Sequence, residues 1–373
     1  MAQNKTKKDI HPFLNELAIL FPVAILAGLG LIMIHSASAS ISFSEHGTAF
    51  HYVQKQLVFC ALGFLVMFIA ASVPYKILNP LAYIILVSAF IFLAAVKIPG
   101  LGVKAGGAYR WLKLGGMSFQ PSEFTKLAMV IFLAYSLNKK QEQIHRFFVG
   151  FFPHLILLGL LSLLILSQPD LGSVVILGAI TWGMMFVAGV RLLHLASLIP
   201  IIIPLVYFQV YKIPYRMERL FAYLYAWDDP QDTGYQITHS LKAFGSGGLF
   251  GKGIGLGMQK LHYLPEPHTD FILSIIGEEL GLFGVLIILV LYGIILMRGA
   301  RIAKEADTLF GTLTAAGLTI ALALQVTINT GVTMGLLPTK GLTLPFLSYG
   351  GTSLLISMAG MGILMNIGSH KKS

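Results

Sequence analysis

Long apolar runs separated by short polar turns dominate the sequence. A helix that crosses a lipid bilayer needs about 20 mostly apolar residues, and runs of this length recur along the whole chain. They predict about ten transmembrane helices. Their approximate ranges are 15–37, 52–73, 77–96, 121–138, 147–167, 170–189, 191–212, 271–297, 308–332 and 347–368. The pattern therefore predicts an all-α polytopic membrane protein that forms a single domain over residues 1–373.

One long polar stretch, residues 213–270, interrupts this pattern between the seventh and eighth runs. It is rich in glycine and carries charges of both signs. It could be a flexible connection. However, a connection of this length without a role is unusual in a compact domain, so we expect it to take part in function.

The basic residues in the short loops predict the orientation in the membrane. Lys and Arg concentrate in loops on the cytoplasmic side. If the N-terminus lies inside, most of these residues fall on its face, among them Lys5, Lys139, Arg191, Arg298 and Lys371. Both termini are therefore predicted to be cytoplasmic, with 213–270 forming a large extracytoplasmic loop between helices 7 and 8. An odd number of helices would break this asymmetry.

The composition agrees with a membrane protein. Hydrophobic residues make up 56% of the chain and charged residues only 11%, whereas soluble domains carry about 25% charged residues. The net charge of +10 could indicate a nucleic-acid partner, but its placement fits membrane topology and a basic outer surface, so none is predicted. The only cysteine, Cys60, lies in an apolar run and excludes a disulfide framework. The first run is too long for a cleavable signal peptide.

Asp270 stands where the polar stretch meets the eighth apolar run. It could cap the helix that follows. A carboxylate beside apolar walls also has its pKa raised towards the range of a general base. His268, two residues earlier, could tune this group or hydrogen-bond a substrate, or it could simply be solvated. Glu278 and Glu279 fall two turns into the helix, and we expect one of them to face the interior beside a cation or polar group.

Four more residues near the outer boundary carry candidate chemistry. Glu123 and Lys126 share a helical face, either as an ion pair that fixes the helix or as substrate contacts. Arg110, with Trp111, could contact a substrate or anchor the chain at the interface. Asp170 is a favoured N-cap of the sixth helix, or else a partner for an outward-facing cation such as Lys126.

The outer segments favour a phosphate-bearing ligand. Basic residues recur in the long polar stretch, including Arg216 and Lys260. Basic groups beside a membrane attract lipid headgroups or a lipid pyrophosphate. Residues 335–353 carry two prolines and several glycines at membrane depth. Irregular backbone is tolerated there only where protein buries it or water wets it, so this segment is predicted to line the same outer cavity.

Four blocks in this order, with this topology, resemble the SEDS family (shape, elongation, division and sporulation proteins) over nearly the whole chain. The blocks are residues 109–111 with 120–123, then 168–172, 264–281 and 338–353. Within the family, residues 259–260, 263–266, 277–281 and 338–343 are closer to the division member than to the elongation member. Tyr109 and Pro267 depart from the residues common there.

The resemblance implies a peptidoglycan glycosyltransferase that polymerises lipid II during septal wall synthesis. It also implies a class B penicillin-binding protein and other division proteins as partners, at the septum of the bacterial cytoplasmic membrane. Asp270 matches the essential outer-loop aspartate of the family and would be the base of an inverting transfer. An elongation polymerase, a lipid II transporter and a non-catalytic scaffold remain alternatives. A transporter would be expected to have repeats and a midplane site, and neither is evident.

Candidate substrate contacts surround this base. The cations that could neutralise the departing diphosphate are Arg110, Lys126, Arg216 and Lys260, or a divalent cation such as Mg²⁺ or Mn²⁺. Glu123, Asp170 and His268 complete the predicted set of substrate-binding residues. The sequence does not choose among them.

Overall fold

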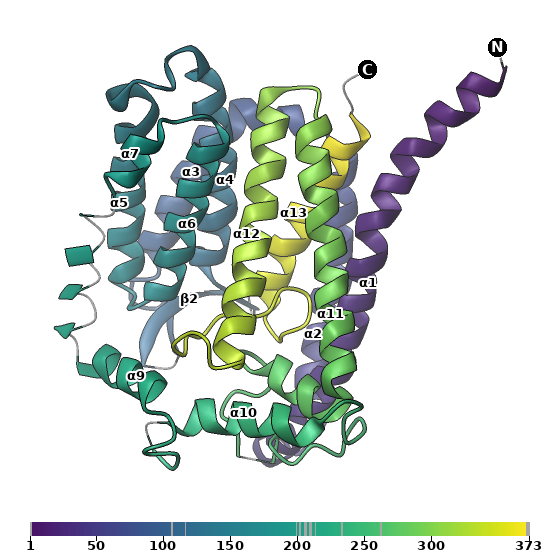
Figure 1. Ribbon diagram of the computed structural model, residues 1–373, viewed down its shortest axis with the longest axis vertical. Helices are drawn as coiled ribbons and strands as arrows, with labels where there is room; N and C mark the ends of the chain where they lie inside the picture. The colour runs from purple at the N-terminus through teal and green to yellow at the C-terminus, as the bar shows by residue number, and fades with distance from the viewer. Residues whose placement is uncertain are drawn as a thin grey trace.

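Long helices that run in alternating directions make up most of the protein (Figure 1). The computed structural model describes residues 2–370 except 106, 116, 199, 201–202, 205–206, 209–210, 213, 233 and 262. The α-helices are α1 (Ala2–His46), α2 (His51–Ser72), α3 (Leu78–Ala95), α4 (Pro121–Lys139), α5 (Phe152–Leu166), α6 (Leu171–Val187), α7 (Leu192–Ala196), α9 (Pro214–Leu224), α10 (Tyr235–Gly247), α11 (Ile272–Glu305), α12 (Leu309–Thr333) and α13 (Gly351–Ser369).

The predicted spans coincide with these helices. Within the described residues, seven helical segments are long and apolar enough to cross a membrane: Leu17–His46, His51–Ser72, Tyr75–Ala95, Phe147–Leu166, Ile272–Glu305, Leu309–Thr333 and Gly351–Ser369. The apolar α6 is shorter, and α4 matches the fourth predicted span. Only α7 and scattered later residues of the seventh span, 191–212, are described, and the rest of that prediction lies outside the described residues.

The two ends of the bundle differ as the charge pattern predicts. Both termini lie at the same end, at the top of Figure 1, whereas α9 and α10 lie at the opposite end. The asymmetry of basic residues assigns the end with the termini to the cytoplasm. Residues 213–270 are therefore an outer segment, and much of it is helical rather than a flexible connection.

A small antiparallel sheet accompanies the helices that the sequence predicted. Its strands are β1 (Gly102–Ala105), β2 (Ala108–Leu114) and β3 (Met117–Phe119), in the order β1-β2-β3. Val103 pairs with Trp111, and Leu112 pairs with Phe119. Glycine at 107 and 115 takes a positive φ in the two turns, which tight hairpins require. The strands are short and lie in a glycine-rich loop, so the alternation of apolar and polar residues along them was not recognised in the sequence.

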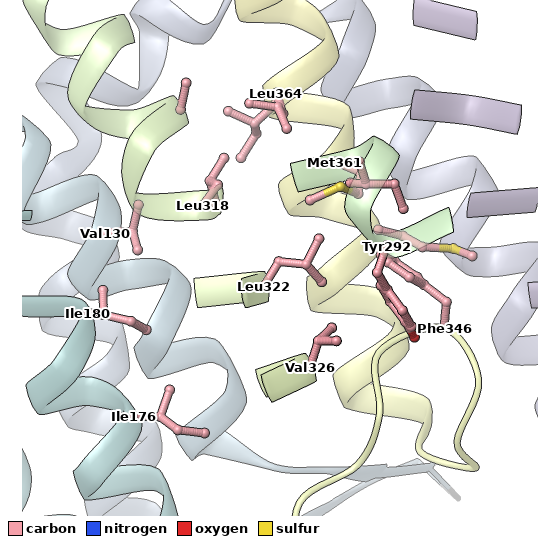
Figure 2. Close-up of a cluster of buried hydrophobic side chains, with 14 of the residues drawn as sticks. Val130, Ile176, Ile180, Tyr292, Leu318, Leu322, Val326, Phe346, Met361 and Leu364 are labelled. Atoms are coloured by element: carbon pink, nitrogen blue, oxygen red, sulfur yellow. The ribbon is translucent and has the colours of Figure 1, made fainter. Parts of the chain in front are cut away.

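Helix α12 is the centre of the bundle and packs on α4, α6, α11 and α13. Leu318, Leu322 and Val326 follow one another at four-residue spacing on α12 (Figure 2). They lie between Val130 and Ile180 on one side and Met361 and Leu364 on the other, and all of these side chains are buried. Lipid offers no hydrophobic drive between helices, so this close packing itself holds the bundle together.

The outer segment joins this bundle where α10 crosses α11. Glycines occupy the crossing on both helices. A Cβ on Gly247 would collide with the carbonyl oxygen of Gly277, and one on Gly277 would collide with the Phe244 ring. The two backbones therefore approach more closely than side chains would permit. This contact positions the outer segment over the start of α11, immediately after Asp270.

Gly247→Ala is expected to lower the thermal unfolding temperature of the detergent-purified protein, because overpacking a tight contact typically costs about 1–3 kcal/mol. Gly245→Ala is the matched control on the same helix, since a Cβ there meets nothing within 4 Å. The control should be neutral or slightly stabilising. Equal unfolding temperatures for the two variants would contradict the crossing.

Candidate active site

A cavity of about 2210 Å³ opens at the outer end of the bundle. Residues of α2, α5, α6, α12 and the sheet line it. Two irregular segments, one around Asp270 and one between α12 and α13, contribute as well. Four of the predicted site residues border the cavity, namely Arg110, Glu123, Asp170 and Asp270. Three others, Lys126, Lys260 and His268, are not among the described residues that line the cavity. The side chain of Arg216 lies outside the described part of the protein.

Residues 338–350, which we call the strap, connect α12 to α13 and line this cavity as predicted. The amide of Asn329 on α12 donates to two backbone oxygens, at 2.6 Å to Leu342 and 3.0 Å to Asp270. A Cβ on Gly341 would lie 3.0 Å from Asp270 Oδ2. One buried amide therefore holds the strap and Asp270 side by side, with the carboxylate against a glycine.

Asp270 is half-buried and borders the cavity. The N-cap of α11 is Phe271, and no side chain caps the helix at that position. The helix-cap interpretation of Asp270 therefore loses its support. The carboxylate instead belongs to the wall of a large, mostly apolar cavity at the outer rim of the bundle.

Lys340, in the strap, is a cation that was not among the predicted site residues. It lines the cavity next to Gly341 and is half-buried. It forms no ion pair with any residue that the structure describes. Burial lowers the pKa of its ammonium group, and the charge of Asp170 opposes this shift. Its position on a proline- and glycine-rich segment at membrane depth was the signal that could have identified it.

Glu123 and Lys126 form the predicted ion pair. Their charged groups lie 2.8 Å apart, and both side chains are more than nine-tenths buried. Gln325 on α12 donates to the same carboxylate at 3.4 Å. The pair thus connects α4 to α12. Glu123 reaches the cavity wall, whereas the ammonium of Lys126 is already bound to it.

Asp170 caps α6, as the sequence favoured. Its carboxylate accepts hydrogen bonds from the Ser173 backbone N–H at 3.0 Å and from the Ser173 hydroxyl at 2.7 Å. Ser122 on α4 contributes a longer one at 3.4 Å. The alternative role, as partner of Lys126, is wrong in this structure because Lys126 pairs with Glu123.

Arg110 fastens the sheet to the turn between α5 and α6. Its Nε donates to the carbonyl oxygen of Gln168 at 3.0 Å, and Nη2 donates to that of Pro169 at 2.7 Å. A guanidinium has five N–H donors, so these contacts leave donors for a ligand in the cavity that Arg110 lines. Its predicted substrate contact stays a prediction.

His268 is neither solvated nor part of the cavity wall, and the structure corrects both expectations. Its ring packs against Tyr52 and Tyr349, with ring centres 4.7 and 5.6 Å away. Its carbonyl oxygen accepts from the Tyr349 N–H at 2.9 Å. Burial lowers the pKa of the imidazole, and Glu266 and Glu45 oppose this. His268 therefore holds the strap against the segment that carries Asp270.

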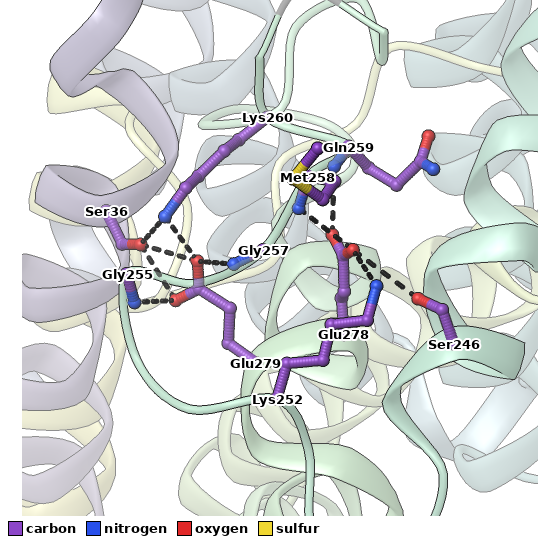
Figure 3. A network of polar contacts seen from close by, with 10 residues as sticks. All are labelled: Ser36, Ser246, Lys252, Gly255, Gly257, Met258, Gln259, Lys260, Glu278 and Glu279. Carbon is purple, nitrogen blue, oxygen red and sulfur yellow. Dashed lines mark hydrogen bonds and ion pairs between the residues drawn. The ribbon is translucent and has the colours of Figure 1, made fainter.

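Glu278 and Glu279 both face the interior, each beside its own lysine (Figure 3). Lys252 Nζ lies 2.8 Å from Glu278, and Lys260 Nζ lies 2.6 Å from Glu279. Ser36 on α1 bonds the Glu279 carboxylate and accepts from Lys260. Lys260 is therefore bound inside the protein, away from the large cavity, contrary to the expected substrate contact.

Backbone N–H groups complete both carboxylate sites. Met258 and Gln259 donate to Glu278 at 2.9 and 3.0 Å, and Gly255 donates to Glu279 at 3.0 Å. These bonds wrap the outer segment around the second turn of α11. The network fixes the helix start that follows Asp270, and it leaves both glutamates fully paired.

Comparisons with known proteins agree with this architecture. A family model described as FtsW/RodA/SpoVE, cell cycle protein, matches residues 17–373. A probable peptidoglycan glycosyltransferase FtsW of Geobacter sulfurreducens is 43% identical and covers 98% of this chain and 97% of its own length. The stage V sporulation protein E of Bacillus subtilis is 42% identical, with coverages of 98% and 100%.

The chain belongs to the FtsW/RodA/SpoVE family of cell cycle proteins. A chain from a solved peptidoglycan synthase complex, described as coordinating polymerization and crosslinking, aligns with a TM-score of 0.75 at 29% identity. The match covers 94% of this chain and 96% of that chain. The family resemblance drawn from the four sequence blocks is thus confirmed, together with the helical membrane fold.

The described residues of this FtsW/RodA/SpoVE family member offer no ready metal site. Among them, no three His, Cys, Asp or Glu side chains gather as a metal-binding group. Asp270 and Asp170 border the same cavity without forming such a group. A divalent cation at this site stays a prediction from the sequence.

Lys260→Met is expected to destabilise the folded protein, because removing one partner of a buried ion pair typically costs about 3–5 kcal/mol. Thermal unfolding in detergent measures the effect. Lys242→Met, at an exposed lysine of α10, is the matched control and should leave the unfolding temperature unchanged. If Lys260→Met unfolded normally and lost only activity, Lys260 would be a substrate contact after all.

Proposed function

We propose that this protein is a peptidoglycan glycosyltransferase that polymerises lipid II in the bacterial cytoplasmic membrane during septal wall synthesis. One observation carries the proposal: Asp270 and Lys340 border the same outer cavity, with Gly341 against the Asp270 carboxylate. The carboxylate supplies a base, and the ammonium supplies a charge for a phosphate. The names of the relatives, FtsW above all, support the same activity.

The proposed reaction forms one bond and breaks another. The acceptor sugar's 4-hydroxyl oxygen attacks the anomeric carbon of the donor, whose bond to the lipid diphosphate breaks. Asp270 takes the hydroxyl proton, and the electron pair leaves with the diphosphate. An α-linked donor then gives a β-linked product by inversion in a single displacement. One general base therefore suffices, and no covalent enzyme intermediate forms.

Lys340 is the described cation best suited to the departing diphosphate. It lies on the strap beside the glycine that touches Asp270. A preorganised charge in a partly dry site stabilises developing negative charge more strongly than the same charge in water. Arg110 has further donors nearby, whereas Lys126 and Lys260 are bound to Glu123 and Glu279.

The apolar part of the cavity fits the lipid tail. Its walls come largely from α5 and α6, including Leu155, Leu158, Val175, Trp182 and Phe186. Trp182 and Phe186 are largely exposed side chains of this wall. A prenyl chain could thus remain among apolar side chains while its diphosphate reaches the polar end.

We further propose a crosslinking partner, a class B penicillin-binding protein, together with other division proteins at the septum. The solved relative belongs to a complex described as coordinating polymerization and crosslinking. A polymerase alone makes glycan strands, and crosslinking requires a second activity. The partner would supply that activity on the same outer face.

Asp270→Asn is expected to lower the polymerisation rate of purified protein by at least about 100-fold, because general-base catalysis contributes typically 10²–10⁴-fold. The thermal unfolding temperature should stay close to that of the unmodified protein. Asp232→Asn, at an exposed carboxylate of the same outer segment, is the control and should keep full activity. A folded Asp270→Asn protein that polymerises normally would refute the base assignment.

The pH profile tests Lys340. Because burial lowers the pKa of its ammonium, Lys340 loses its proton at a lower pH than an exposed lysine, and polymerisation should fall on the alkaline side. Lys340→Arg keeps the charge, since the arginine pKa exceeds 12, so its alkaline limb should move to higher pH. Lys104→Arg, at an exposed lysine of β1, should leave the profile unchanged. Superimposable alkaline limbs for the Lys and Arg forms at 340 would contradict the role.

A further inference from the structure

We propose that the cavity holds donor and acceptor together in two arms, and that Lys55 on α2 binds the diphosphate of the acceptor lipid. This inference rests on the proposed function and assigns the second of its two substrates to a site. One arm is bounded by α5 and α6, and the other arm is bounded by α2 and the sheet.

The make-up of the cavity wall first suggests two occupants. The wall draws on elements from distant parts of the sequence. Apolar residues of α5 and α6 form one group, and Lys55, Val58 and Phe59 with parts of the sheet form another.

The α2 arm has its own charge and its own walls. Lys55, Val58 and Phe59 all line it, and their i, i+3, i+4 spacing puts them on one face of α2. Val103 and Trp111, a cross-strand pair of the sheet, line it as well. Lys55 is exposed, one turn into α2, and it makes no ion pair with the described part of the chain.

The strap and the start of α13 connect the two arms and put Asp270 between them. Leu342 lies against Gly172 at the start of α6, where an added Cβ would be 3.6 Å from its Cδ2. The preceding Gly341 touches the Asp270 carboxylate, and Gly351, at the first position of α13, packs against the Phe59 ring of α2. A path along this backbone therefore runs from the α6 arm past the base to the α2 arm.

The chemistry then assigns a lysine to each diphosphate. The leaving diphosphate is bonded to the carbon under attack, so its cation must lie close to Asp270, as Lys340 does. The acceptor presents its 4-hydroxyl to the same base, while its own diphosphate lies at the far end of a disaccharide. That second diphosphate needs a cation in the other arm, and Lys55 is the lysine that lines it.

A lysine near the end of a membrane helix often serves only as an interfacial anchor. Two lipid II analogues separate that role from substrate binding. A 4-deoxy analogue lacks the attacking hydroxyl and can only donate. An analogue with carbon in place of the anomeric oxygen cannot release its diphosphate and can only accept. Together they give a single lipid-linked tetrasaccharide, so KM can be measured for each substrate separately.

Lys55→Ala should raise KM for the acceptor-only analogue about tenfold, the loss expected for one charge-assisted hydrogen bond. Its kcat and its KM for the donor-only analogue should stay unchanged, and Lys55→Arg should recover most of the acceptor affinity. Lys113→Ala is the matched control, because Lys113 is exposed on β2 and absent from the described cavity wall. It should behave as the unmodified protein.

The outcomes separate this inference from the proposed function. If Lys55→Ala leaves both KM values unchanged, Lys55 is an anchor and the inference fails while the polymerase stands. If Lys55→Ala raises the donor KM instead, the assignment of the arms is wrong. If the two analogues give no tetrasaccharide with the unmodified protein, while lipid II itself is not polymerised either, the proposed function fails.

Discussion

The side-chain amide of Asn329 holds together the two pieces of backbone on which the proposed chemistry depends. It donates to Asp270 and to Leu342, and it is almost completely buried on α12. Together with the bond from the Tyr349 N–H to the His268 carbonyl oxygen, this tie joins the segment before α11 to the strap at the rim of the bundle. With it, a carboxylate and a lysine from distant parts of the chain face one cavity. The central helix thus positions a site that is formed by irregular backbone.

Buried charge explains why so few of the acidic and basic groups are available to a substrate. A charge in a dry interior must be paired. Glu123, Glu278 and Glu279 are each paired, with Lys126, Lys252 and Lys260 respectively. These three pairs connect helices and fix the outer segment. Catalysis is then assigned to groups at the cavity wall, which remain accessible to a lipid that enters from the bilayer.

Local patterns in the sequence were sufficient for the features that local physics determines. Run length predicted the described spans, three-residue spacing offered the Glu123–Lys126 pair as one of two alternatives, and the residue type favoured Asp170 as an N-cap. Patterns could not reveal which distant groups meet. Ser36 donates to Glu279, which lies 243 positions away in the sequence. Both of these side chains bind Lys260, so Lys260 is a structural residue rather than a candidate ligand. For the same reason, the sequence did not predict that His268 is buried or that Lys340 lines the cavity.

A cryo-electron microscopy map of the protein bound to a 4-deoxy analogue of lipid II, which can only donate, would show directly where the diphosphate of the donor lies. The account predicts that the diphosphate lies against Lys340, with the anomeric carbon facing Asp270 and the prenyl chain along α5 and α6. A diphosphate bound at the end of the bundle with the termini, or in a groove that Asp270 does not border, would contradict it.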